Sequence, residues 1–391
     1  MEFVSSIKMG NDPELFIKSG NRLLPSESII KSKHRTVKVD NAAVELQPGP
    51  SHCLQMQNKF IASALAVVKK ILIDQDLAAT HISVRPVERL RLEDIDKYST
   101  VCAFGCQPSL VYDGDGLRTS APTVNPRKVR FRSVGYHVHI GSSKPGTDYW
   151  EYKHAREKRV CNLLHTTEGR VRLVQMCDLF VGLPAVLMER DNRVPIRRKT
   201  LGYGKAGEFR EQPHGFEYRT LGSWPLLHPM WGWWANGMVR DCLNLVFNDL
   251  DTDIRKSINM TKVAEIINEG NLAGALEYWQ AAKNTLIPIM KQWGDKFSNV
   301  NLADSHPLFS KELLKRFDFL AMKRDLVRRV FNFNSWCKRK HFKGWEGQRL
   351  VGFHIGFDNG SKERVKEFED WPEFSESWSL SKDIISKQML A

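Results

Sequence analysis

Residues 195–222 read PIRRKTLGYGKAGEFREQPHGFEYRTLG and join a glycine-rich basic loop to a short alternating segment. Within residues 216–221, Glu217 and Arg219 alternate with residues of mostly apolar or aromatic character. Successive side chains of a strand point to opposite faces of a sheet. The pattern therefore predicts a strand that carries a carboxylate and a guanidinium group on one face and packs its other face into a core.

Period-2 alternation recurs in four segments earlier in the chain, residues 9–16, 37–47, 81–85 and 135–141. In the last of these, His137 and His139 lie opposite three apolar residues. Pro13 indicates that pairing in residues 9–16 begins late or at a sheet edge. If these strands share one sheet, six ionisable side chains converge on one surface: Glu14, Glu45, His137, His139, Glu217 and Arg219.

Such a surface has the composition of a metal and phosphate site. Carboxylate oxygens with one or two imidazoles suit Mg²⁺ or Mn²⁺, whereas structural zinc would need more Cys and His. The His-x-His pattern also occurs in zinc hydrolases, and a pair of hydrogen-bonded structural histidines is the simplest alternative. The sequence HVHIGSSK lacks the nearby Asp-His of a metallo-β-lactamase-like nuclease.

The basic loop supplies six cations, Arg197, Arg198, Lys199, Lys205, Arg210 and Arg219. Gly202, Gly204 and Gly207 allow backbone amides to approach an anion, and guanidinium groups match phosphate and carboxylate oxygens. The alternative is an ordinary solvated loop. Carboxylates beside such a loop suit Mg-nucleotide chemistry. The chain has no G-x-x-x-x-G-K-[ST] pattern, which excludes a P-loop.

Composition limits the class of protein. The chain has 391 residues, 42% hydrophobic and 26% charged, with 58 Lys+Arg against 45 Asp+Glu and a net charge of +13. These values exclude a wholly disordered or collagenous chain. Asp178 and Pro184 interrupt the longest apolar stretch, and the N-terminus has no signal-like apolar run, so we expect a cytoplasmic protein without a membrane partner. The seven scattered cysteines are expected to be reduced.

The positive charge attracts nucleic acid as well as phosphorylated small molecules. A second basic cluster, KRKHFK at residues 338–343, keeps the nucleic-acid alternative open. Helical patterns cover residues 59–74, 150–183 and 230–250, and most of the chain from residue 261 onward, including 311–333. The chain is therefore expected to be α+β, with a catalytic core at residues 1–255 and a helical region at 256–391 that could pack on it.

The order of the motifs resembles a known family. GNDPELFI (10–17), VDNAAVELQP (39–48), GYHVHIG (135–141) and RRKTLGYGKAGEFREQPHGFEYRTLGSW (197–224) resemble the phage amidoligase family of carboxylate–amine ligases. These ligases are similar to glutamate–cysteine ligase and glutamine synthetase. The resemblance covers about residues 8–250. It implies a glutamine synthetase-like fold, in which the concave face of a curved antiparallel sheet holds the active site and helices lie behind.

The resemblance also implies a reaction. ATP would phosphorylate a substrate carboxylate, and an amine would displace the phosphate to form an amide or peptide bond. The substrates would be small-molecule or peptide carboxylates and amines, and the site would use Mg²⁺ or Mn²⁺. Two alternatives keep a related fold: a phosphotransferase, or a nucleic-acid-binding or phage structural protein that has lost activity. If a phage encodes the chain, the expected location is the host cytoplasm.

Roles carry over only at matching positions. The metal ligands implied are Glu14, Glu45, His137 or His139, and Glu217. Arg219 would face the acyl phosphate or the γ-phosphate. The remaining cations, Arg197, Arg198, Lys199, Lys205 and Arg210, would contact phosphate or the substrate carboxylate. Asp12 would be a ligand or the base that deprotonates the amine. Position 16 is Phe, so Asp12 and Glu14 would replace the E-x-E pattern of glutamate–cysteine ligases, and the number of metals stays open.

Overall fold

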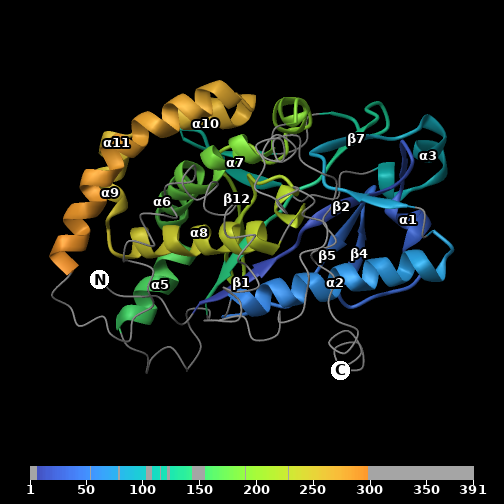
Figure 1. The fold of residues 1–391 in the computed structure, drawn as a ribbon, viewed down its shortest axis with the longest axis horizontal. Helices are drawn as coiled ribbons and strands as arrows, with labels where there is room; N and C mark the ends of the chain where they lie inside the picture. The colour runs from blue at the N-terminus through green and yellow to red at the C-terminus, as the bar shows by residue number, and fades with distance from the viewer. Residues whose placement is uncertain are drawn as a thin grey trace, which may run out of the picture.

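The computed structural model describes residues 7–297, apart from residues 53, 78–79, 103–107, 115, 121–123, 143–154, 190 and 228. The predicted helix at 311–333 and the basic cluster at 338–343 lie outside the described residues. The described chain combines antiparallel sheets with helices, which confirms the predicted α+β class (Figure 1). The likeness to glutamine synthetase stays a prediction.

The main sheet has six strands, each antiparallel to its neighbours. In spatial order they are β1 (Lys8–Asn11), β11 (Val138–Gly141), β13 (Gly215–Tyr218), β12 (Glu208–Gln212), β8 (Ser109–Tyr112) and β9 (Leu117–Ser120). His139 lies opposite Gly10 on one side and Glu217 on the other, and Glu217 lies opposite Arg210. Residues paired across neighbouring strands share a face. This register therefore aligns an imidazole, a carboxylate and a guanidinium group in one row.

A second sheet follows where the chain leaves β1 at Asp12 and Pro13. It contains β3 (Arg22–Leu24), β2 (Glu14–Ser19), β5 (Ala43–Leu46) and β4 (Val37–Asp40), and β6 (His81–Ser83) also pairs with β2. A smaller pair joins β7 (Val87–Arg89) to β10 (Phe131–Ser133). Glu14 and Glu45 lie opposite each other on β2 and β5. The site strands therefore lie in two sheets, and the condition under which the sequence places all six ionisable side chains on one sheet surface is not met.

Two predicted strands are broken by turns. Residues 9–16 divide at Asp12 and Pro13 into β1 and β2. Residues 37–47 form a hairpin, because Asn41 adopts a left-handed conformation (φ 56°) between β4 and β5. Asparagine tolerates this conformation better than most residues. The alternation expected across residues 37–47 therefore fails at the turn.

Helices cover the sheets. They are α1 (Ser26–Ile29), α2 (Leu54–Asp74), α3 (Leu92–Lys97), α5 (Ala155–His165), α6 (Thr167–Cys177), α7 (Leu183–Glu189), α8 (Pro229–Phe247), α9 (Asp251–Ser257), α10 (Met260–Glu269) and α11 (Leu272–Phe297). Short 3₁₀ turns lie at Thr100–Cys102 and Trp224–Leu227, and π turns at Asp178–Gly182 and Ile196–Thr200. α2 contacts β1 of the main sheet and both β4 and β5 of the second (Figure 1).

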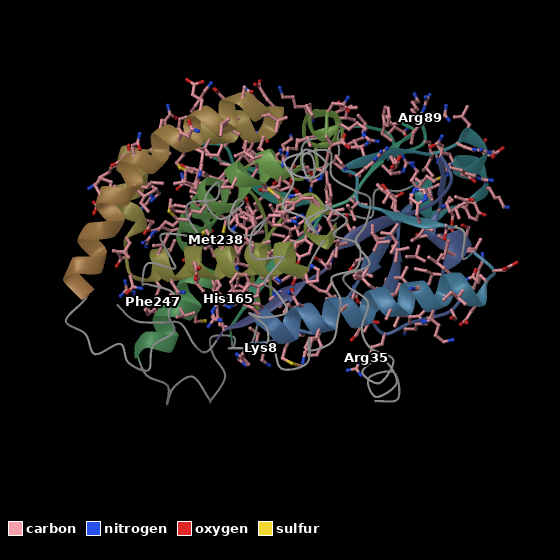
Figure 2. The ribbon with its side chains drawn as sticks, viewed as in Figure 1. Lys8, Arg35, Arg89, His165, Met238 and Phe247 are labelled. Carbon is pink, nitrogen blue, oxygen red and sulfur yellow. The ribbon has the colours of Figure 1, made fainter. Side chains whose placement is uncertain are left out.

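One hydrophobic core runs from the main sheet into the last described helices. Val138 and Phe216 bury the apolar face of the sheet, and Met238 on α8 lies among the same buried side chains (Figure 2). Trp279 on α11 packs edge to face on Phe180, with ring centroids 6.4 Å apart. The predicted boundary at residue 255 falls inside α9, and the described helices beyond it contribute to this core.

The helical stretch Thr167–Glu189 is long and apolar enough to cross a membrane by length and composition alone, although 83% of its apolar window is buried inside the protein. It is the one such stretch among the described residues. Buried core helices of globular proteins have the same composition. The expectation that the protein has no membrane partner stays a prediction.

Candidate functional site

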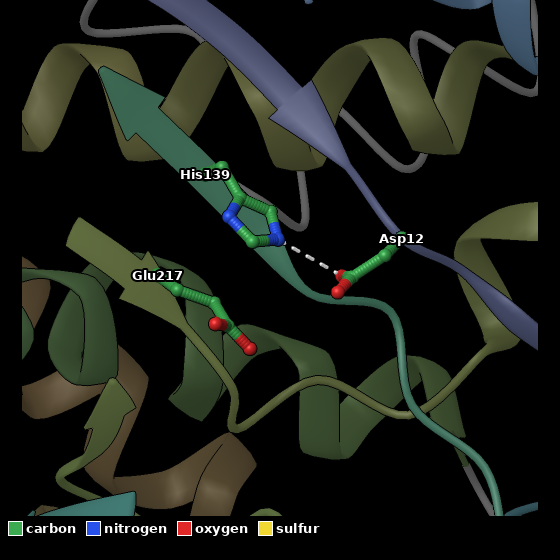
Figure 3. A group of neighbouring side chains, drawn as sticks. All are labelled: Asp12, His139 and Glu217. Carbon is green, nitrogen blue, oxygen red and sulfur yellow. Dashed lines mark ion pairs between the residues drawn. The ribbon is translucent and has the colours of Figure 1, made fainter. Parts of the chain in front are cut away.

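Asp12, His139 and Glu217 meet at the polar face of the main sheet (Figure 3). Asp12 comes from the link between β1 and β2, His139 from β11 and Glu217 from β13. One possible ligand atom from each lies within 4.8 Å of the other two. His139 Nε2 is 3.1 Å from Asp12 Oδ1. Three segments far apart in the sequence thus form a compact group of oxygen and nitrogen donors.

His137 adds a second imidazole to this group. Its Nδ1 lies 3.1 Å from Asp12 Oδ1 and 3.6 Å from Glu217 Oε1. Although His137 Nδ1 and Asp12 Oδ1 are buried and close, neither makes a hydrogen bond of good geometry within the described residues. The sequence predicts that His137 or His139 is a ligand. In the structure both rings approach Asp12 Oδ1, His137 through Nδ1 and His139 through Nε2.

The charges of this group shift its pKa values in opposite directions. Burial raises the pKa of Asp12, but the charges of His139 and His137 outweigh burial and hold that pKa well below its usual range. Burial, with the nearby Arg219, lowers the pKa of His137. Burial also lowers the pKa of His139, but the Asp12 carboxylate outweighs burial and raises the pKa of this ring overall. The site therefore favours an ionised Asp12.

Glu217 and Arg219 form a fully buried ion pair. Arg219 Nε also lies 3.5 Å from Glu208 Oε1, and Arg210 Nη1 lies 3.6 Å from Glu217 Oε1. Gln212 donates a further hydrogen bond to the Glu217 carboxylate. Burial opposes ionisation of Glu217, but the guanidinium group of Arg219 and the imidazole of His139 outweigh it and lower the pKa to about 2. Glu217 is therefore an anion throughout the neutral range.

Glu14 and Glu45 bring the second sheet to the edge of this group. Glu14 accepts hydrogen bonds from the Gly135 amide at 2.8 Å and the Tyr203 hydroxyl at 2.6 Å. Burial raises the pKa of Glu14 well above its ordinary value, and the nearby Asp40 adds to the effect. Burial likewise raises the pKa of Glu45 to about 7. The hydrogen bond from Gln47 opposes this shift, whereas the charges of Asp12 and Asp40 add to it.

Asp40 is a member of this acidic group that sequence reasoning missed. It lies at the end of β4, directly before the Asn41 turn, and burial raises its pKa. On a continuous strand Asp40 and Glu45 would face opposite ways, but the hairpin brings both toward Glu14. The Asp40-Asn41 pair, typical of tight turns, is the signal that could have revealed it.

The basic loop does not present its cations together. Arg197 is fully buried and donates to the carbonyl groups of Thr220 at 3.0 Å and Leu221 at 2.8 Å. Arg198 is also fully buried, forms an ion pair with Glu189 at 3.1 Å and donates to the Gly204 carbonyl. These contacts fasten the loop to the segment after β13. Carbonyl groups and a carboxylate, rather than an open anion site, surround both guanidinium groups, so the expected phosphate role has no support here.

The other predicted phosphate ligands lie apart. Lys199 is exposed and pairs with Glu269 on α10 at 3.2 Å. Lys205 is half-buried, and its backbone amide donates to Glu208 Oε2 at 2.9 Å. Arg210 is the partly exposed cation beside the acidic group, with a side chain 20% exposed. It is therefore the member of the predicted cation set best placed to meet an incoming anion beside Glu217.

Two buried amide side chains, Asn11 and Asn236, support the segments that carry the site. Asn11 donates to the His137 carbonyl at 3.0 Å and to Asn236 Oδ1 at 2.8 Å, and Asn236 on α8 returns a hydrogen bond to Asn11 Oδ1 at 3.0 Å. This reciprocal pair ties β1, directly before Asp12, to β11 and α8. His139 Nδ1 is in addition 3.2 Å from His214 Nε2. Sequence reasoning missed these supporting residues, because nothing local in the sequence links Asn11 to Asn236.

The donor set fits a hard divalent cation. Carboxylate oxygens with one or two imidazoles are ligands typical of Mg²⁺ and Mn²⁺. The buried Asp12 Oδ1 and His137 Nδ1, which face each other without a good hydrogen bond, are atoms that a cation between them would satisfy. A grouped set of carboxylates with a guanidinium group beside it is typical of enzymes that handle phosphate groups.

The comparison with protein families agrees with this class. Residues 164–238 match the family described as phage phiEco32-like COOH.NH2 ligase-type 2. The match supports the phage amidoligase family that the motifs resemble, and the family name indicates a ligase that joins a carboxylate to an amine. The matched span contains Arg210, Glu217 and Arg219, whereas Asp12 and His139 precede it. The comparison with curated proteins gives no match.

Proposed function

We propose that the protein is an ATP-dependent carboxylate–amine ligase that acts through an acyl-phosphate intermediate. The observation that supports this most is the row formed by His139, Glu217 and Arg210, with Asp12 next to His139. It combines metal-ligating donors with a partly exposed guanidinium group on one sheet face. The family named for COOH.NH2 ligases gives the reaction class.

Asp12, His139 and Glu217, joined by His137, would hold Mg²⁺ or Mn²⁺, and Glu14 and Glu45 would extend the donor set from the second sheet. A divalent cation in such a site neutralises phosphate charge and orients the triphosphate. Arg210 would contact the transferred phosphoryl group or the substrate carboxylate. Arg219 would hold Glu217 in place and add positive charge behind it. Asp12 is a metal ligand in this proposal, with the role of base as its alternative.

The reaction would proceed in two balanced steps. A substrate carboxylate oxygen attacks the γ-phosphorus of ATP, the bond to the β-phosphate oxygen breaks, and ADP leaves. The amine nitrogen then attacks the acyl carbon, the bond to the phosphorylated oxygen breaks, and inorganic phosphate leaves. The nitrogen loses a proton as the amide forms. One carboxylate oxygen therefore ends in the released phosphate.

That oxygen transfer provides the test. Purified protein with Mg-ATP would be screened for ADP release against pooled amino acids, short peptides and polyamines. With an active pair, a carboxylate labelled with ¹⁸O should deliver one ¹⁸O to the released phosphate. Release of ADP and phosphate should need both substrates. No turnover with any pair, or phosphate without the label, would count against the proposal.

Variants test the assignment of the site. Glu217→Gln and Arg210→Ala should each lower kcat/KM by at least about 100-fold if they act on the transferred charge. The matched control is Arg118→Ala on β9, whose guanidinium group pairs with Asp113 at 3.2 Å on the exposed edge of the same sheet. It should leave the rate unchanged. Equal effects of Arg210→Ala and Arg118→Ala on kcat/KM would show that Arg210 does not act in the site.

Two results would redirect the proposal. A stable phosphorylated product that accumulates without any amine would indicate a phosphotransferase. Binding of DNA that weakens steeply with salt, without ATP turnover, would indicate a nucleic-acid-binding protein. We place the proposed ligase in the cytoplasm, that of the host cell where a phage encodes it.

A further inference from the structure

Tyr203 lies between the two halves of the candidate metal centre. Its hydroxyl oxygen is 2.6 Å from Glu14 Oε1, on the second sheet, and 2.8 Å from His137 Nε2, directly before β11. The side chain is buried, with 7% of the residue exposed. Tyr203 belongs to the loop that precedes β12, so one hydroxyl group connects three segments that are distant in the sequence.

The hydrogen-bonding capacity of this hydroxyl group determines which ring nitrogen of His137 carries the proton. A tyrosine hydroxyl donates one hydrogen and can accept another. With Glu14 ionised, as a carboxylate beside a bound divalent cation would be, Tyr203 donates to Glu14 and its oxygen accepts from Nε2–H of His137. A neutral imidazole protonated at Nε2 has its lone pair at Nδ1. Nδ1 is the nitrogen that lies 3.1 Å from Asp12 Oδ1 and 3.6 Å from Glu217 Oε1.

The ring of Tyr203 is held rigidly enough to impose this orientation. The guanidinium carbons of Arg197 and Arg219 lie over the ring, 5.0 and 5.3 Å from its centroid. Arg197 is itself fixed by the carbonyl groups after β13. Gly204, with φ at 69°, lies so close to Arg197 that a Cβ there would overlap the guanidinium group. Arg197 therefore supports the ring of Tyr203 from within the loop.

We propose that Tyr203 is a positioning residue of the metal centre: its hydroxyl selects the Nε2–H form of His137, directs the Nδ1 lone pair toward Asp12 and Glu217, and fixes Glu14 at the same time. It acts through His137 and Glu14 and is not itself a ligand. Outer partners of this kind set the ring orientation and basicity of metal-ligating histidines. The inference rests on the metal centre of the proposed function, and it adds the residue that prepares the site.

Mn²⁺ binding tests this without any substrate. The free Mn²⁺ signal in electron paramagnetic resonance gives the dissociation constant of the whole chain for wild type and for Tyr203→Phe, which removes only the hydroxyl. We expect affinity to fall by about 10- to 100-fold, as for other outer partners of metal ligands. The matched control is Tyr278→Phe on α11, whose hydroxyl also makes two hydrogen bonds, both with the Asn259 backbone. It should bind Mn²⁺ as wild type does.

A double-mutant comparison separates positioning from a general loss of structure. In a His137→Ala background, Tyr203→Phe should lower Mn²⁺ affinity by a smaller factor than it does in wild type, because the ring that the hydroxyl orients is gone and only the hydrogen bond to Glu14 remains to be lost. Near-ultraviolet circular dichroism checks that the variants are folded. Wild-type affinity in Tyr203→Phe, or the same loss with and without His137, would overturn the inference.

The outcomes also separate this inference from the proposed function. If wild type binds Mn²⁺ and Tyr203→Phe binds it weakly, but no ligase activity is found, the positioning role stands and the reaction is wrong. If the ligase is active and Tyr203→Phe binds Mn²⁺ normally, only the role of Tyr203 is wrong. If wild type binds no Mn²⁺, the metal centre and the role of Tyr203 are both overturned.

Discussion

Replacing Glu217 by Gln should destabilise the protein in a way that depends on pH. The substitution keeps the size of the side chain and removes its charge. In the folded protein Glu217 is fully buried, pairs with Arg219 and lies beside His139, and its pKa is about 2 against an ordinary value of 4.5. A carboxylate whose pKa falls on folding stabilises the folded state above its unfolded pKa.

Two independent routes give the magnitude. The pKa difference of about 2.5 units corresponds to about 3 kcal/mol at pH 7, since one unit is worth about 1.4 kcal/mol. Removing one partner of a buried ion pair typically costs about 3–5 kcal/mol. The two values agree. The contribution declines as pH falls from about 4.5 through 2, and less than half of it should remain at pH 3.

Urea unfolding of wild type and Glu217→Gln between pH 3 and pH 7 measures this difference. The control is Glu265→Gln on α10, an exposed carboxylate that pairs with Lys262 at 3.0 Å. It undergoes the same chemical change and should alter the free energy of unfolding by less than about 0.5 kcal/mol, because exposed pairs contribute little. A difference for Glu217→Gln below about 1 kcal/mol at pH 7, or one that is constant with pH, would refute the reasoning.

Three further results are expected. Gly204→Ala should lower the free energy of unfolding in urea titrations by at least about 1 kcal/mol more than Gly20→Ala does. Both glycines have positive φ, but of the two only Gly204 lies against a buried guanidinium group. Equal losses would contradict this. Burial raises the pKa of Asp178 from 3.8 to about 7, so the wild type should lose about 1 kcal/mol of stability per pH unit relative to Asp178→Asn between pH 5 and pH 7. Parallel pH profiles in denaturation would argue against this. Mn²⁺ at 100 times its dissociation constant should stabilise the fold by about 2.7 kcal/mol in thermal unfolding, an increase that EDTA reverses; an unchanged melting temperature would count against a metal site in the folded state.

The local part of the site could be predicted from the sequence. Alternation in residues 135–141 and 216–221 assigns His139 and Glu217 to one face of their strands and Val138 and Phe216 to the core, and the structure confirms both faces. Such patterns depend only on the two-residue repeat of a strand, which holds as long as the strand is unbroken. Strand pairing then brings the two polar residues together.

The pattern fails wherever a turn interrupts the strand. Residues 37–47 alternate over their whole length, yet the turn at Asn41 folds them into a hairpin and reverses which side chains accompany Glu45. Asp40 therefore joins the acidic group although alternation assigns it to the opposite face. A one-residue change of phase transfers every later side chain to the other face. Turn residues therefore need to be located before alternation is used to assign a face.

The basic loop shows why charge alone does not reveal a role. By sequence, Arg197 and Arg210 are equivalent cations in one glycine-rich motif. In the structure Arg197 satisfies backbone carbonyls beneath Tyr203, whereas Arg210 stays partly exposed beside Glu217. A buried guanidinium group with five donors can organise irregular backbone, because it satisfies several carbonyl groups at once. The positive charge of this loop thus has two parts: the buried guanidinium group of Arg197 supports Tyr203, and under the proposed function the partly exposed Arg210 would meet an anionic substrate.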